Sequence, residues 1–553
     1  MSVRIVRRVA ETAACPATLS NVPVAGQRRL LALLALIAVP AAALGSVLDN
    51  DPFVPDTLFN GGLPVVETFH TPEDFDRPGR RVLRLANGDL VVAADIRLQA
   101  HAFDGSSIAL ARYLPDGGPM HWENASGDDM VADGMALVWP ASVSGFPDNA
   151  VEHRVLDLKQ IGDRILVLYA RIHPTPVNHQ IMLDVFDSWG GRMSRTTIHS
   201  APVLPREAAM APYRTSLLVP PGAEPGDRVL IAAPFNVGSS QTPQWQLDVA
   251  RYRFADAQAA PQPDNDFNAG QFNRLYSLPA SCSGQADARH GDDMKLAISH
   301  SVVTVTVPVT TPPRLYLANT LTRNGQDDVG VLAINASNSE PIGSFGSNTC
   351  SSGFRITGFN NGGSNNDRAA GISVVMQGSP RVPVIHVLAS VDRDCAPGMG
   401  VARLLDNGNF DFAFGNLGRL VFGGRGYVGP NACLATRITH MPTALIHTQS
   451  NRLAIAGAMR STGLSTPPVV SENPFVAILD GESGVVGDLR SLPVRVEAGG
   501  SRIGDGGFVD LVEDGENRLV LAGDVRDERE PEGWLRATLT RLVADRIFGN
   551  GLD

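Results

Sequence analysis

The sequence predicts an all-β fold, a single β-propeller with seven four-stranded blades. Three observations carry this prediction. A short apolar segment recurs seven times, at intervals of 64 to 86 residues. Gly, Asn or Asp precedes most copies, as expected where a tight turn enters a strand. The 55 glycines and 39 prolines in 553 residues leave little room for long helices. Six or eight blades, or two smaller β domains, are the alternatives.

The recurring segment is expected to be the second strand of each repeat. A first strand precedes it across the turn, and a third follows, with an Ala-Arg ending in the copies at Arg112, Arg251 and Arg403. Alternating apolar residues bounded by turn formers indicate antiparallel strands. The seven copies are Leu90–Ala93, Ile165–Leu168, Val229–Ala232, Leu315–Ala318, Val384–Val387, Leu453–Ala456 and Leu519–Ala522.

A fourth element, Asp-x-x-Phe followed closely by Gly, is expected to form a turn before an outer strand. The Asp should accept backbone N–H bonds, and the Phe should fill a gap between repeats. Its copies begin at Asp56, Asp264, Asp411 and Asp545. The resulting units lie around residues 80–150, 151–210, 211–280, 290–350, 365–425, 435–495 and 505–553.

The two chain ends predict how the ring closes. The last repeat stops at its Asp-x-x-Phe turn, where an outer strand should begin, and a spare apolar strand is available at residues 63–69. We expect 63–69 to pair with the last blade, because an open sheet edge would template aggregation.

Residues 1–43 are expected to be a signal peptide, followed by the propeller at 44–553. Arg28 and Arg29 precede the apolar run Leu30–Val39, and small residues follow Pro40. The run is short for a transmembrane span, although a buried helix or a membrane anchor is the alternative. We therefore expect an exported protein (extracellular, periplasmic or at the cell surface) with no transmembrane anchor in the mature chain.

Four cysteines remain after residue 43, and an even number in an exported chain suggests two disulfides. Of the three possible connectivities we favour neighbour pairing, Cys282 with Cys350 and Cys395 with Cys433. Four free buried thiols are the alternative. The absence of a CxxC pattern argues against a zinc ribbon or a redox pair.

Three stretches resemble the delta-60 repeat of secreted and surface bacterial proteins: residues 81–96, 400–422 and 517–524. The resemblance implies β-propeller-like repeats and export, and it implies no reaction. The chain departs from the repeat at 160–260 and 300–345, where loops are long. Residues 546–553 are also similar to a short tail on other exported bacterial proteins, although a last repeat turn explains them equally well.

The charge balance excludes one class of partner. The 57 acidic residues exceed the 46 basic ones, which gives a net charge of -11 and argues against nucleic-acid binding. Only two of the basic residues, Lys159 and Lys295, are lysines. We expect a monomer.

No motif points to a catalytic residue or a bound cofactor. Gly424–Gly429 matches GxGxxG by letter, but Pro430 follows and no helical pattern does. Acidic residues recur just before predicted first strands, at Asp292, Asp293, Asp367 and Asp505. They could hold a hard cation such as Ca²⁺ at a channel mouth. We favour the simpler interpretation, in which each Asp caps its own turn.

The favoured function is that of an exported, non-enzymatic propeller that binds a protein or glycan partner through loops on one face. Long inserts at 98–107, 172–180, 236–246, 461–474 and 526–533 all join second and third strands. One alternative is an enzyme (a hydrolase, lyase or dehydrogenase) with its site at the channel mouth, for instance from His290, Asp292 and Arg368. Another is a structural surface component.

Overall fold

The computed structural model places its described residues in one compact unit, Pro52–Asp553. These residues are 58, 60, 65–67, 75–97, 106–120, 122, 135–138, 152–172, 180–200, 216–219, 228–236, 245–255, 260–276, 289–298, 313–323, 326–346, 353–359, 366–379, 381–392, 396–426, 437–462, 470–492, 494–495, 503–514, 518–526 and 535–543. The predicted signal peptide, the C-terminal tail and all five cysteines lie outside them.

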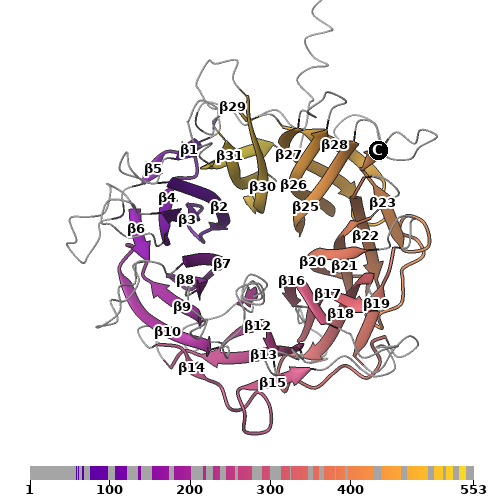
Figure 1. Cartoon of the computed structure of the whole chain (residues 1–553). Coiled ribbons are helices and arrows are strands. Elements are labelled where there is room, and N and C mark those ends of the chain that lie inside the picture. Colours follow the sequence, from indigo (N-terminus) through magenta and orange to yellow (C-terminus); the bar gives the residue numbers. More distant parts are fainter. Residues whose placement is uncertain are drawn as a thin grey trace, which may run out of the picture. The chain divides into compact units, whose positions relative to one another are not determined.

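The described strands form a seven-bladed β-propeller, as the sequence predicts (Figure 1). Each blade is an antiparallel sheet of four or five strands, and the described residues contain no α-helix. In that same part of the chain, no helix has the length and apolar character needed to cross a membrane.

Blades 1 to 3 are built in chain order from the axis outwards. Blade 1 contains β2 (Phe75–Arg84), β3 (Leu90–Arg97), β4 (Ser106–Tyr113), β5 (Pro119–Met120) and β6 (Met135–Val138). Blade 2 contains β7 (Glu152–Ile161), β8 (Arg164–Ile172), β9 (Gln180–Phe186) and β10 (Arg192–Ser200). Blade 3 contains β11 (Ser216–Leu218), β12 (Arg228–Asn236), β13 (Trp245–Arg253), β14 (Gln262–Pro263) and β15 (Asn273–Tyr276).

Blades 4 to 7 repeat the same order, with short additional strands in the last two. Blade 4 contains β16 (Arg289–Ile298), β17 (Arg314–Arg323), β18 (Gln326–Asn335) and β19 (Phe354–Thr357). Blade 5 contains β20 (Asp367–Gln377), β21 (Val382–Val391), β22 (Gly398–Leu404) and β23 (Arg419–Phe422). Blade 6 contains β24 (Arg425–Gly426), β25 (Arg437–His447), β26 (Arg452–Thr462), β27 (Val470–Asp480) and β28 (Val486–Ser491). Blade 7 contains β29 (Val494–Arg495), β30 (Ile503–Asp514), β31 (Arg518–Arg526) and β32 (Leu535–Val543).

The strand predicted at 63–69 is β1 (Val65–Glu67), and it pairs antiparallel with β32 of blade 7. Val66 lies opposite Thr538, and the buried Val65 lies opposite Leu539. Val65 also joins one apolar cluster with residues of blades 7 and 1, including Val520 and Val92. The edge of β32 is therefore covered by a strand from the other end of the chain.

The apolar core is divided among the interfaces between blades. Among the described residues it forms seven clusters, and each contains side chains from two neighbouring blades. The second strands supply much of this core, because their residues face a neighbouring blade on both sides. Every blade therefore depends on its two neighbours for burial of its apolar surface.

The Asp-x-x-Phe turn packs between blades as predicted where the structure describes it. Phe267 and Phe414 are fully buried, and each lies in a cluster with the next blade. The carboxylate of Asp264 accepts the Nε–H groups of Arg228 and Arg251, both at 2.8 Å. The turn therefore also anchors the arginine of the Ala-Arg motif.

An arginine from each of six blades reaches the turn after the third strand of the next blade. We call these residues the arginine belt: Arg112, Arg164, Arg251, Arg314, Arg403 and Arg541. Arg251 Nη1 donates to Ala336 O and Ser337 O, and Arg403 Nη1 donates to Glu482 O at 2.6 Å. Arg112, Arg314 and Arg541 donate to Ser188 O, Asp406 O and Pro115 O. Arg164 instead stacks its guanidinium 4.6 Å from the ring centre of Phe254. The Ala-Arg motif is thus a device that joins neighbouring blades.

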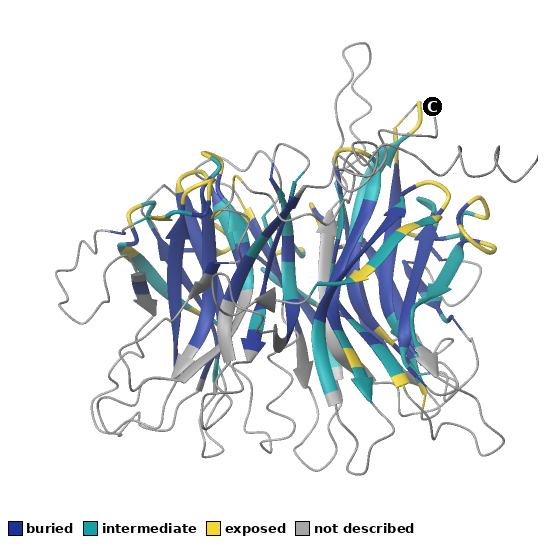
Figure 2. Cartoon of the chain, turned by 90° about the horizontal axis from the view of Figure 1, so that it is seen from above, coloured by how far each residue is buried: buried dark blue, intermediate teal, exposed yellow. Residues whose placement is uncertain are grey.

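The connections between strands emerge at two faces, because successive antiparallel strands reverse direction. We call the face with the second-to-third-strand connections the loop face, and the face with the first-to-second-strand turns the turn face. Exposed turns gather along one edge of the ring in the side view (Figure 2). Most of the predicted long inserts on the loop face lie outside the described residues.

Candidate functional site

The first strands of the blades surround the axis, and a common register brings one residue of each to the same level. These residues pair with the fourth residue of the recurring second-strand segment. We call them the waist ring: Arg81, Asp157, Ser216, Lys295, Ile372, Ala444 and Asp510. Six of the first strands shift register against the second strand near this level, and such bulges redirect side chains.

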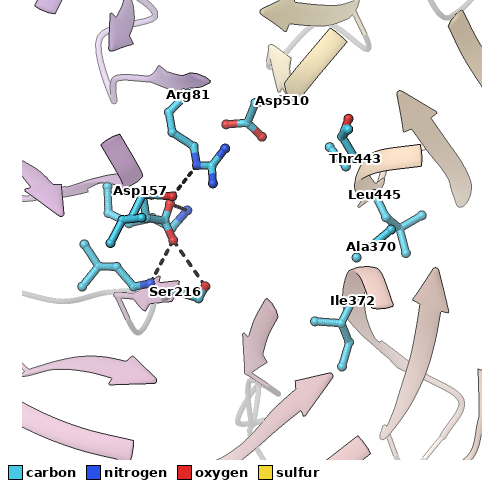
Figure 3. Close-up of a pocket in the computed structure, with 13 residues that line it drawn as sticks. Arg81, Asp157, Ser216, Ala370, Ile372, Thr443, Leu445 and Asp510 are labelled. Carbon is cyan, nitrogen blue, oxygen red and sulfur yellow. Dashed lines mark hydrogen bonds and ion pairs between the residues drawn. The ribbon is translucent and has the colours of Figure 1, made fainter. Parts of the chain in front are cut away.

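A cavity of about 120 Å³ lies in the channel, and six members of the waist ring line it (Figure 3). The seventh, Lys295, has a side chain outside the described part of the chain. The lining differs between the two sides of the axis. A charged arc comprises Arg81, Asp157, Lys159, Ser216 and Asp510, and an apolar arc comprises Ala370, Gly371, Ile372, Ala444 and Leu445.

Asp157 is the centre of the charged arc. Its Oδ1 accepts bonds from the Leu158 N–H and from Lys159 Nζ, both at 2.9 Å. Its Oδ2 accepts the N–H of Leu217 in blade 3 at 2.9 Å and lies 3.4 Å from Ser216 Oγ. Burial alone would raise the pKa of this carboxyl, but nearby Lys159 and Arg81 and these hydrogen bonds hold its pKa below the usual value. Asp157 is therefore an ionised group that ties blade 2 to blade 3.

Asp510 repeats the same arrangement between blades 7 and 1. Its Oδ1 lies 3.0 Å from the N of Leu511, and its Oδ2 accepts the N–H of Val82 at 3.1 Å. Arg81 of blade 1 forms the next link, because its Nε donates to Leu156 O of blade 2 at 2.6 Å. Side chains of the charged arc thus bond to the backbone of the following blade from blade 7 through blade 3. These bonds fix the positions of the charged groups without any ligand.

The apolar arc joins blades 5 and 6 by close contact. A Cβ atom added to Gly371 would lie 2.8 Å from Leu445 Cβ, so only glycine lets the strands approach this closely. Thr443 marks the end of the arc, and its Oγ1 donates to Phe508 O of blade 7 at 2.8 Å. This side of the cavity therefore offers aliphatic surface.

Two residues further along each first strand, toward the turn face, lies a second ring. Its members are Leu83, Lys159, Leu218, Ala297, Val374, Ile446 and Val512. Lys159 is the one ionisable residue among them, and 38% of its side chain is exposed. Both lysines of the sequence thus lie on first strands, Lys159 on β7 and Lys295 on β16.

The structure locates the acidic residues proposed for a cation. Asp367 is the first residue of β20, is fully buried, and accepts the N–H of Phe359 at 2.8 Å. The sequence predicts that Asp292, Asp293 and Asp505 lie just before their strands. This prediction is wrong, because they lie within β16 and β30. The strands begin earlier than expected because polar residues are tolerated at their loop-face ends. The side chains of these three residues lie outside the described part of the chain.

No described residues supply a cluster of three His, Cys, Asp or Glu side chains placed to hold a metal ion. Of the residues considered for an enzymatic site, Arg368 pairs with Asp327 at 3.1 Å and is 55% exposed, outside the waist cavity. The side chain of His290 is not among those described.

The waist ring was not predicted from the sequence, although a signal was present. Asp157 and Asp510 each interrupt an apolar first strand at the same position of the repeat. Charged residues inside a buried strand are rare unless they are paired. Their equivalence is hidden because the bulges shift the first strand against the second.

No protein family model matches the chain, and no curated protein matches its sequence. Among solved structures, the chain is similar to one described as the Dos1 propeller, with 7% identity and a TM-score of 0.39 over 84% of this chain and 94% of that chain. It is also similar to Drosophila Semaphorin 2a, with 9% identity and a TM-score of 0.38 over 87% and 76% of the two chains. An endo-arabinase from Bacteroides thetaiotaomicron has 12% identity and a TM-score of 0.25 over 56% and 88%. These values are too low to carry an activity over.

Proposed function

We propose that the protein is an exported, non-enzymatic propeller that binds a protein or glycan partner through the connections of its loop face. One observation carries the proposal. Five of the seven blades have second-to-third-strand connections of seven or eight residues, 98–105, 173–179, 237–244, 463–469 and 527–534. The described second and third strands of these blades are joined at the loop face, so each of these connections starts and ends there.

The hydrogen bonds of the charged residues in the channel support a structural role for these residues. Asp157, Asp510 and Arg81 each bond to the backbone of a neighbouring blade, as expected of groups that hold the ring together. A general acid or base must instead present its proton to a substrate. Recognition on the loop face therefore fits the chain better than chemistry in the channel.

A printed glycan array tests the proposal, together with cross-linking to exported proteins of the source organism. A loop-face variant replaces residues 463–469 by Asn-Gly, the turn that two-residue hairpins favour. A control variant replaces Gly162-Asp163, the two residues between β7 and β8, by Asn-Gly. We expect the loop-face variant to lose at least about tenfold in affinity, which corresponds to about 1.4 kcal/mol. The control should bind as wild type.

Two results would overturn the proposal. Binding that survives replacement of all five connections would place the partner elsewhere. Release of reducing ends from an array glycan would identify an enzyme.

A further inference from the structure

The waist cavity combines two surfaces of opposite character. Its described lining carries two positive groups, Arg81 and Lys159, and two negative groups, Asp157 and Asp510. The formal charges of these four described groups cancel. A ligand that carries both charges and an apolar body would match both arcs.

Two of the charged groups have capacity for further hydrogen bonds. The Lys159 ammonium has three N–H donors, and Asp157 accepts one of them at 2.9 Å. Each oxygen of Asp510 accepts one backbone N–H, whereas an ionised carboxylate has about four lone-pair positions. Lys159 can therefore receive a ligand carboxylate, and Asp510 can receive a ligand ammonium group.

The opposite wall suits an aliphatic group. Ile372, Ala444 and Leu445 line it, and Figure 3 shows Ile372 and Leu445 across the cavity from Arg81 and Asp157. At about 30 Å³ for each water, the 120 Å³ cavity has room for roughly four waters, which limits it to a small ligand. The site is thus too small for a sugar chain or a peptide.

We propose that the waist of the channel binds an aliphatic α-amino acid, with its carboxylate on Lys159, its ammonium group on Asp510 and its side chain against Ile372 and Leu445. Backbone bonds of the neighbouring blades already fix Asp157 and Asp510, and Asp157 holds the Lys159 ammonium, so little ordering of these carboxylates accompanies binding. This site is separate from the loop face, and it stands whether or not a macromolecular partner binds there.

Isothermal titration calorimetry of the intact protein with L-leucine tests the site. The comparison ligands are 4-methylpentanoate, which lacks the ammonium group, 3-methylbutylamine, which lacks the carboxylate, and glycine, which lacks the side chain. We expect L-leucine to bind at least about tenfold more tightly than each of them. Absence of binding by leucine, isoleucine and valine at concentrations on the order of 10 mM would overturn the proposal, as would equal binding of all four ligands.

A charge-removing variant locates the carboxylate. Lys159→Met should weaken L-leucine binding at least about tenfold and leave 3-methylbutylamine binding unchanged. Arg368→Met is the matched control, because Arg368 is also a first-strand cation paired with Asp, at 3.1 Å from Asp327, and does not line the cavity. Unchanged leucine binding in Lys159→Met would refute the assignment. If circular dichroism shows that this variant does not fold, the ligand series on the wild-type protein decides.

Discussion

The charged arc and the apolar arc occupy the same level of the propeller, yet they join their blades in different ways. In the charged arc, Asp157 and Asp510 bond to backbone N–H groups of the next blade. In the apolar arc, Gly371 allows β20 to approach Leu445 of the next blade. The first kind of junction depends on ionisation and hydrogen bonds, and the second depends on shape. Neighbouring blades can thus be joined at the same level of the ring by an electrostatic link or by a packing contact, and the cavity has a charged side and an apolar side as a result.

At neutral pH, the largest effect of a single substitution is expected from removal of a charged link. Asp157→Ala leaves the N–H groups of Leu158 and Leu217 without their acceptor and leaves Lys159 without its counter-ion. Loss of a buried acceptor with several donors should lower the free energy of unfolding by about 3 kcal/mol. Urea denaturation measures this change. The control is Asp163→Ala in the exposed turn after β7, and equal losses in the two variants would contradict a linking role for Asp157.

Acid should destabilise the blades of the apolar arc through His386, which is fully buried in blade 5. Burial, the neighbouring His447 ring and Arg403 lower the pKa of His386 to about 3, while its bond to Gly481 O opposes this shift. The unfolded chain, with a histidine pKa near 6.5, therefore takes up a proton first as pH falls. Stability should decrease between about pH 6.5 and 3, by up to about 1.4 kcal/mol per pH unit.

The carboxyl of Asp157 also loses its contribution to stability on acidification, but at lower pH than His386. Its pKa in the folded protein is lowered from 3.8, so the stability that it contributes is present above that value and is lost only below it. His386→Gln should therefore flatten the stability profile between pH 6.5 and 4, and Asp157→Asn should leave that part of the slope unchanged. Thermal unfolding at a series of pH values measures both. An unchanged slope in His386→Gln would show that other groups cause the loss.

Adding a single methyl group at Gly371 is expected to disrupt the packing between blades 5 and 6 at the apolar arc. Gly371→Ala places its Cβ 2.8 Å from Leu445 Cβ and 3.2 Å from Leu445 N, which should cost about 2 kcal/mol of unfolding free energy. The double variant Gly371→Ala/Leu445→Gly removes the Cβ contact but not the backbone contact. A double-mutant cycle should therefore show partial rescue. If the changes in unfolding free energy of the two single variants simply add in the double variant, the two residues do not interact.

How far the sequence predicts this molecule depends on how local each feature is. The second strands, their turns and the buried Phe267 and Phe414 follow from short repeated patterns, and the structure confirms them. The waist ring was missed because its links join distant segments. Asp510 and Val82 are 428 positions apart. The arginine belt was found only in part, since Arg164 and Arg314 are the first residues of second strands, whereas Arg112 and Arg251 lie on third strands. These two sets of positions converge only in space, at the turns of the next blade.

The arginine belt includes residues from the blades of both arcs. Loss of a belt arginine should therefore change stability by similar amounts in the blades of the charged arc and in those of the apolar arc. Arg112 bonds Asp89 through Nε and Nη2 and reaches Ser188 O of blade 2 through Nη1. Arg403 reaches Glu482 O of blade 6 and Gln377 Oε1, both at 2.6 Å.

A lysine offers one compact ammonium group and cannot span such partners. Arg112→Lys and Arg403→Lys should therefore each lose about 1 to 2 kcal/mol in urea denaturation, by similar amounts. Arg490→Lys is the control, because Arg490 is 42% exposed and pairs with Asp488 on the surface; it should change stability by less than about 0.5 kcal/mol. A large loss in Arg112→Lys beside none in Arg403→Lys would show that the blades of the two arcs are joined differently at the turn face as well as in the channel.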